Sequence, residues 1–104
     1  MNKKIKAIVK RPDEKYGHMT NIANNLKNLQ RTVDGYIEVL TDSTWPFAII
    51  CNEEGKLRGL DYNMPLFGDF LVGTIIVVGV DGEEFTDCPI TLKQWKDVVD
   101  FQDL

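Results

Sequence analysis

The stretch that decides the fold covers residues 47–63 and reads FAIICNEEGKLRGLDYN. Residues 47–51 would be apolar on both faces of a strand, which is typical of a central strand. Residues 52–55 form an acidic turn, whose glycine tolerates a positive φ. We therefore predict a hairpin with a return strand over residues 56–60, followed by a loop over residues 61–69 that is rich in hydrogen-bonding groups.

Two strands and a helix are predicted before this hairpin. Residues 5–9 alternate between apolar and polar side chains, as in a strand with one face on the core. Residues 20–33 have apolar residues at helical spacing, with Thr20 as the N-cap and Gly35 just beyond the helix. Residues 36–40 form the next strand. The apolar stripe of the predicted helix consists of Ile22, Leu26, Leu29 and Val33.

Three more elements are predicted after the hairpin. Residues 70–80 form the longest apolar strand, and residues 83–86 form a short acidic edge strand. A capping box of Thr91 and Gln94 begins a helix over residues 91–101. The order β-α-β-β-β-β-(β)-α predicts an α+β fold, with a single mixed, mostly antiparallel sheet of five to six strands covered by two helices. The first β-α-β unit could make its two strands parallel neighbours, joined by a right-handed crossover.

Length and composition indicate one globular domain over residues 1–104, since 43% of the 104 residues are hydrophobic. We find no secretory signal and no apolar run long enough to span a membrane, so we expect a soluble, cytoplasmic protein. Cys51 and Cys88 are expected to be reduced, although their spacing leaves a disulfide open. Residues 1–33 have a net charge of +6 within a total of −4.

Four segments of the sequence carry a family resemblance: IKAIVKRP (5–12), GYIEV (35–39), CNEEGKLRGL (51–60) with Asn63, and VGT to VG (72–79). Together they resemble a family of small uncharacterised proteins, a domain of unknown function. The family is found largely in phages, plasmids and other mobile elements of bacteria. The resemblance covers residues 4–87, and it implies a small cytoplasmic protein of a mobile element but no reaction. Family members tend to have a proline near Asp61 and Tyr62 and basic residues after the asparagine, whereas this chain departs from that pattern with the run DYNMP over residues 61–65.

The turn and the loop of the hairpin contain one group of candidate binding residues. Asn52, Asp61, Tyr62 and Asn63 could converge on a polar ligand, because amides donate and accept hydrogen bonds as nucleotide recognition requires. Asparagine and aspartate also bond to their own backbone in turns, so a purely structural role stays open.

The predicted first helix contains a second group. Asn21, Asn24, Asn25 and Asn28 recur at helical spacing and would line one face, which could contact a partner or simply be solvated. A third pattern is the series of lysines at positions 4, 6 and 10, which could follow a phosphate backbone or protect a sheet edge. The negative net charge disfavours nucleic acid as a partner.

Catalytic chemistry is poorly represented. The only histidine is His18, and the sequence has no metal-ligand spacing and no phosphate-binding glycine loop. We therefore expect no metal, no cofactor and no catalytic residues. The leading hypothesis is a non-enzymatic binding module that engages a host or element-encoded protein. The alternative is a protein that binds or sequesters a small molecule, such as a nucleotide.

Overall fold

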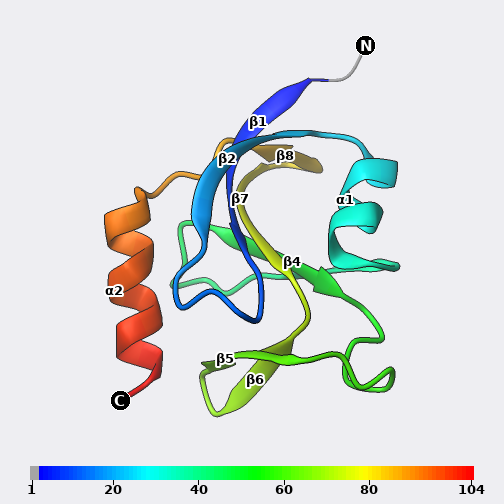
Figure 1. Ribbon diagram of the computed structural model, residues 1–104. Coiled ribbons are helices and arrows are strands. Elements are labelled where there is room, and N and C mark those ends of the chain that lie inside the picture. Colours follow the sequence, from blue (N-terminus) through cyan, green and yellow to red (C-terminus); the bar gives the residue numbers. More distant parts are fainter. Residues whose placement is uncertain (1–2) are drawn as a thin grey trace.

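The computed structural model describes residues 3–104, and its fold class is the predicted one, α+β (Figure 1). Met1 and Asn2, which the single-domain prediction also covers, lie outside the described residues. The elements in chain order are β1 (Lys4–Lys10), β2 (His18–Ala23), α1 (Leu26–Val33), β3 (Ile37–Leu40), β4 (Ala48–Asn52), β5 (Tyr62–Leu66), β6 (Asp69–Val72), β7 (Ile75–Asp81), β8 (Glu84–Thr86) and α2 (Leu92–Gln102).

The main sheet has six strands in the order β2-β1-β7-β4-β3, with β8 paired to β7. A second sheet consists of β5 and β6, and every strand pair of the described residues is antiparallel. The mostly antiparallel sheet with two helices is thus confirmed. The parallel pairing of β1 and β3 is wrong, because β7 and β4 lie between them. These two strands carry the most apolar sequence and occupy the central positions, where both faces are buried.

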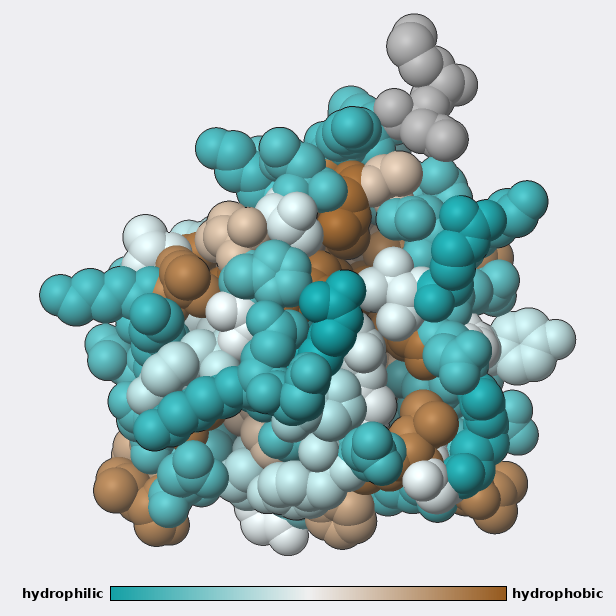
Figure 2. Space-filling view, in the orientation of Figure 1, coloured by the Kyte–Doolittle hydropathy of each residue, from teal (hydrophilic) through white to brown (hydrophobic). Residues whose placement is uncertain are grey.

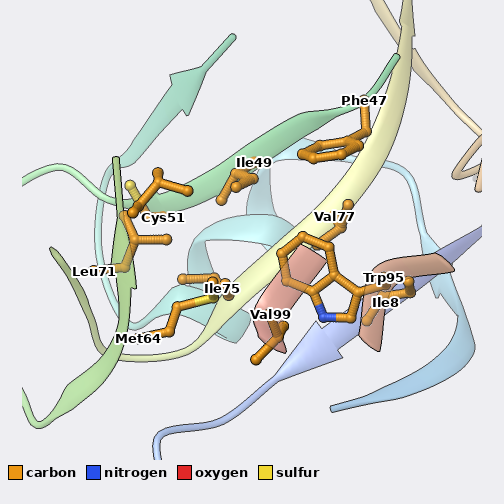
Figure 3. Close-up of a cluster of buried hydrophobic side chains, with 11 residues drawn as sticks. Ile8, Phe47, Ile49, Cys51, Met64, Leu71, Ile75, Val77, Trp95 and Val99 are labelled. Atoms are coloured by element: carbon orange, nitrogen blue, oxygen red, sulfur yellow. The ribbon is translucent and has the colours of Figure 1, made fainter. Parts of the chain in front are cut away.

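One helix covers each face of the sheet (Figure 1). Side chains alternate along β4 and β7, so Ile49 and Val77 face α2 while Ile50 and Ile76 face α1. Figure 3 shows the cluster on the α2 side, with the indole of Trp95 close to Val77. This α2-side cluster consists of Ile8, Phe47, Ile49, Cys51, Met64, Leu66, Leu71, Ile75, Val77, Trp95 and Val99. The α1-side cluster consists of Ile5, Ala7, Val9, Leu29, Val33, Ala48, Ile50, Ile76 and Val78.

The first helix is shorter than predicted, because residues 18–23 form β2 and pair with β1. Pairing satisfies the backbone groups of β1, and Thr20 and Ile22 are β-branched, which favours a strand. The helix begins at Leu26 after Asn25, whose side chain accepts a hydrogen bond from the amide of Asn28. Leu26 is consequently 57% exposed instead of lying in the core.

Three predictions around the hairpin also need correction. Residues 53–59 form consecutive turns instead of a return strand, in keeping with the lack of β-branched and aromatic residues there. Residues 61–69 are not a loop, because most of them form β5 and the turn to β6. The long apolar strand is divided at Gly73, which has a φ of 71° and would place a Cβ 2.9 Å from Leu60 Cδ1.

The second helix is confirmed. Thr91 Oγ1 accepts from the Gln94 amide at 3.1 Å, and Gln94 Oε1 accepts from the Thr91 amide at 2.8 Å. This reciprocal cap satisfies two backbone donors at the start of α2. Trp95 is fully buried and donates its Nε1–H to the carbonyl of Tyr16 at 2.8 Å, so α2 is fixed to the β1–β2 connection.

Candidate functional site

Asn52 lies at the end of β4 and links that strand to the end of α1. Its Nδ2 donates to the carbonyls of Val33 and Asp34, both at 3.0 Å. Its Oδ1 accepts from the amide of Glu54 at 2.8 Å. The side chain is buried, and its amide is engaged within the protein.

Asn63 is likewise buried and engaged, with Lys10 as its main partner. Its Nδ2 donates to the carbonyls of Lys10 and Gly73 at 2.9 and 2.8 Å, and its Oδ1 accepts from Lys10 Nζ at 2.7 Å. Lys10 is only 2% exposed. Burial lowers the pKa of the Lys10 ammonium group, while the negative charges of Glu14 and Asp103 act in the opposite direction. The buried lysine is unlike the solvated strand lysine that the sequence suggested.

Asp61 and Tyr62 lie at the surface. The ring of Tyr62 is tilted against that of Phe70, with 5.9 Å between centroids. The hydrogen bonds of Asn52 and Asn63 place their amides at two separate positions within the protein. The four side chains predicted to surround a polar ligand are therefore not brought together, and a ligand role for Asp61 and Tyr62 stays a prediction.

The predicted amide face of the first helix is not formed, because only Asn28 of the four asparagines lies in α1. Asn21 is in β2, and Asn24 donates to the carbonyl of Phe85 at 2.9 Å. Asn25 is the N-cap, and Asn28 donates back to the carbonyl of Ala23 at 3.0 Å. Three of these amides thus stabilise the transition from β2 to α1 and its packing on β8.

The reactive side chains are few and scattered. His18 Nδ1 lies 2.9 Å from Glu14 Oε2, and the pKa of Glu14 is lowered, chiefly by the hydrogen bond from the Arg11 amide. Burial raises the pKa of the Cys51 thiol to about 11, so it is not a nucleophile at neutral pH. Cys51 and Cys88 are both free. Within residues 3–104, no three histidine, cysteine or acidic residues form a group that could hold a metal ion.

An aromatic groove, which the sequence did not predict, lies between α2, the segment before β4, and the β5–β6 turn. Trp45 stacks on Phe47 at 5.3 Å and on Phe67 at 5.4 Å, between ring centroids. The groove has a volume of roughly 310 Å³, at the lower end of the range of about 300–1,000 Å³ that is typical of ligand pockets. It is lined by Thr44, Trp45, Pro46, Phe47, Phe67, Asp97, Val98, Phe101 and Gln102.

Two aromatic residues of this groove are largely exposed, Phe67 at 57% and Phe101 at 64%. Phe67 has a φ of 45°, a left-handed conformation that is unfavourable for a bulky residue. Its amide donates to Gln102 Oε1 at 2.6 Å, which ties the turn to the end of α2. In Figure 2, apolar side chains also gather over the C-terminal end of α2, at the lower left of a mostly hydrophilic face.

A sequence signal for this groove does exist. Phe67 and Gly68 form a two-residue turn between two strands, where asparagine followed by glycine is the favoured pair. A phenylalanine at that position is a local exception, and such exceptions concentrate at functional sites. The sequence predicts a loop over residues 61–69 instead of this turn, because Pro65 and Gly68 interrupt the apolar pattern there.

None of the helices within residues 3–104 is long and apolar enough to cross a membrane.

Comparison with known proteins places the chain in a family. No curated protein and no solved structure is significantly similar to the chain. The profile of one family, described as Domain of unknown function (DUF3846), matches residues 5–100. The chain therefore belongs to the DUF3846 family, a domain of unknown function.

Proposed function

We propose that this protein is a non-enzymatic binding module of a phage or another mobile element, which acts in the bacterial cytoplasm. In this proposal it engages a host or element-encoded protein through the aromatic groove. The partner contributes an apolar or aromatic side chain, which inserts between Trp45 and Phe101. Aromatic side chains are enriched at the centres of protein interfaces, where they contribute most of the binding energy.

The observation that carries this proposal is the conformation of Phe67. A bulky residue with a φ of 45° is strained by about 1–3 kcal/mol, and the ring is 57% exposed. The ring stacks on Trp45, but more than half of the residue's surface stays in water. A partner that covers the ring would recover the apolar area that folding leaves in water.

The charge at the groove favours a partner that is also basic. Asp97 is the single charged residue among those that line the groove. It lies one helical turn before Phe101, so both face the same side of α2. A lysine or arginine next to the apolar anchor could pair with Asp97 at the rim.

Phe67→Asn is the variant that tests the proposal. It creates an Asn-Gly turn, which relieves the strained backbone and offsets the loss of the stack on Trp45, so the melting temperature should change little. Binding of a partner captured from host lysate, and then titrated in purified form, should weaken at least about tenfold because an anchor contact is lost. The measurements are thermal unfolding and calorimetric titration.

Leu57→Asn is the matched control, since Leu57 is 85% exposed and does not line the groove. It should bind the partner like the unmodified protein. If Phe67→Asn binds the captured protein as tightly as Leu57→Asn does, the groove is not the binding site and the proposal fails. The proposal also fails if none of the captured proteins binds Phe67→Asn more weakly than Leu57→Asn.

A further inference from the structure

The outer edge of the main sheet at β3 offers unpaired backbone groups. β3 ends the strand order, and no strand within residues 3–104 pairs with its outer side. The Tyr36 carbonyl accepts from the Glu53 amide at 2.8 Å, in register with the β3–β4 ladder. Hydrogen-bonded and non-bonded pairs alternate in an antiparallel ladder. The N–H and C=O groups of Ile37 and Val39 therefore point away from β4, towards solvent.

This edge borders an acidic cavity of about 450 Å³ between β3, β4, residues 53–57 and β6. Its charged lining comprises Glu38, Glu53, Glu54, Asp69 and Lys56. The single lysine is already paired with Asp69, at 2.6 Å. The three glutamates have no cationic partner within residues 3–104, so the cavity keeps an excess of negative charge.

We propose that a basic, extended segment of a partner protein adds to the outer edge of β3 as a further strand. Its side chains would alternate between the two faces of the sheet. Those beside Glu38 and Leu40 would lie on the cavity side, so a lysine or arginine there reaches the glutamates. The backbone edge supplies the hydrogen bonds, and the cavity selects the charge.

The charge decides between a partner segment and a second copy of the chain. Two copies paired edge to edge about Val39 would continue the same sheet and bring two acidic cavities together. Like charges that face each other across strands are destabilising. Each chain also has a net charge of −4, which opposes self-association. A basic segment meets neither obstacle.

Binding of a segment at the β3 edge does not require the proposed function of the aromatic groove, because the acidic cavity and the groove share no lining residue. The probe is a capped pentapeptide of alternating lysine and valine, titrated into the full chain and followed by amide chemical shifts. We expect saturable shifts centred on Ile37 and Val39, and slower hydrogen exchange of the Val39 amide. A peptide in which glutamate replaces lysine is the charge control and should bind at least about fivefold more weakly.

Two variants make the test specific. Val39→Pro removes an outward N–H that β4 does not use, so it should abolish binding while the ladder to β4 remains. Val39→Thr keeps that N–H and should bind normally. Glu38→Lys should weaken binding of the lysine peptide and reduce its advantage over the glutamate peptide, which keeps the test decisive if Val39→Pro does not fold. Phe67→Asn should bind the lysine peptide normally, so failure of the aromatic groove is distinguishable from failure of this edge.

Several results would overturn the inference. They are equal binding of both peptides, equal binding by Val39→Pro and Val39→Thr, and shifts that map to residues outside β3 and the cavity. The absence of saturable binding at millimolar peptide would overturn it too. A dimer in sedimentation that Val39→Pro dissociates would mean that a second copy occupies the edge instead.

Discussion

At the scale of single residues, Lys10 and Asn63 form a buried polar pair that connects β1, β5 and the β6–β7 junction. Asn63 donates to two backbone carbonyls and accepts from Lys10 Nζ. A buried ammonium group is costly unless it is hydrogen-bonded, and here both acceptors of Nζ belong to a neutral residue. The pair therefore fixes the position of β5 while it keeps a positive charge away from water.

This arrangement predicts a pH dependence of stability. Burial lowers the pKa of Lys10 in the folded protein below its value of 10.5 in the unfolded chain. Between these two pKa values the unfolded state binds more protons, so folding becomes more favourable as the pH rises. The cost of the buried charge is complete below the folded-state pKa and is relieved as the pH approaches 10.5.

Lys10→Met removes this titration. Urea unfolding at pH 7 and pH 10 gives the free energy of unfolding of both proteins. The value of the unmodified protein minus that of Lys10→Met should be larger at pH 10 than at pH 7. Lys4→Met is the matched control, because Lys4 lies exposed on the same face of the same strand. An equal difference between the protein and Lys10→Met at both pH values would contradict the prediction.

At the scale of elements, a helix or strand could be predicted where a few neighbouring residues define both its end and its buried face. The start of α2 could be predicted because Thr91, Gln94 and Trp95 define its cap and its buried face together. β2 could not, because it exists through its pairing with β1, and that pairing is not encoded within residues 18–23. The tertiary pairing outweighed the helical spacing of Ile22 and Leu26.

The observed start of α1 predicts different effects for neighbouring asparagines. Asn25→Ala removes the acceptor for the Asn28 amide, so it should lower the free energy of unfolding by about 1 kcal/mol. Asn21→Ala, in an exposed position of β2, should change it by less than about 0.5 kcal/mol. Urea unfolding of both variants measures this difference. If Asn21→Ala costs more than Asn25→Ala, the helix begins earlier than the structure places it.

At the scale of the whole molecule, the aromatic groove depends on the packing of one face of the sheet, the face that α2 covers. The aromatic groove is built from Trp45, Phe67 and Phe101, which are far apart in the sequence and meet only in the folded protein. This is why the candidate site could not be read from local spacing. The groove also continues into the core, since Phe47 stacks on Trp45 and packs edge-on against Trp95, at 5.7 Å between centroids. Packing of the α2-side cluster therefore positions the groove, whereas the α1-side cluster contains none of the residues that line it.

A matched pair of valines tests this division. Val33 in α1 and Val99 in α2 are 1% and 2% exposed, so replacing either by alanine should cost roughly 2 kcal/mol. Only Val99→Ala loosens the end of α2, where Gln102 accepts from the Phe67 amide. Hydrogen exchange of that amide should therefore accelerate more in Val99→Ala than in Val33→Ala, at equal loss of global stability. Equal acceleration would mean that the groove opens only with global unfolding and that α2 does not hold it separately.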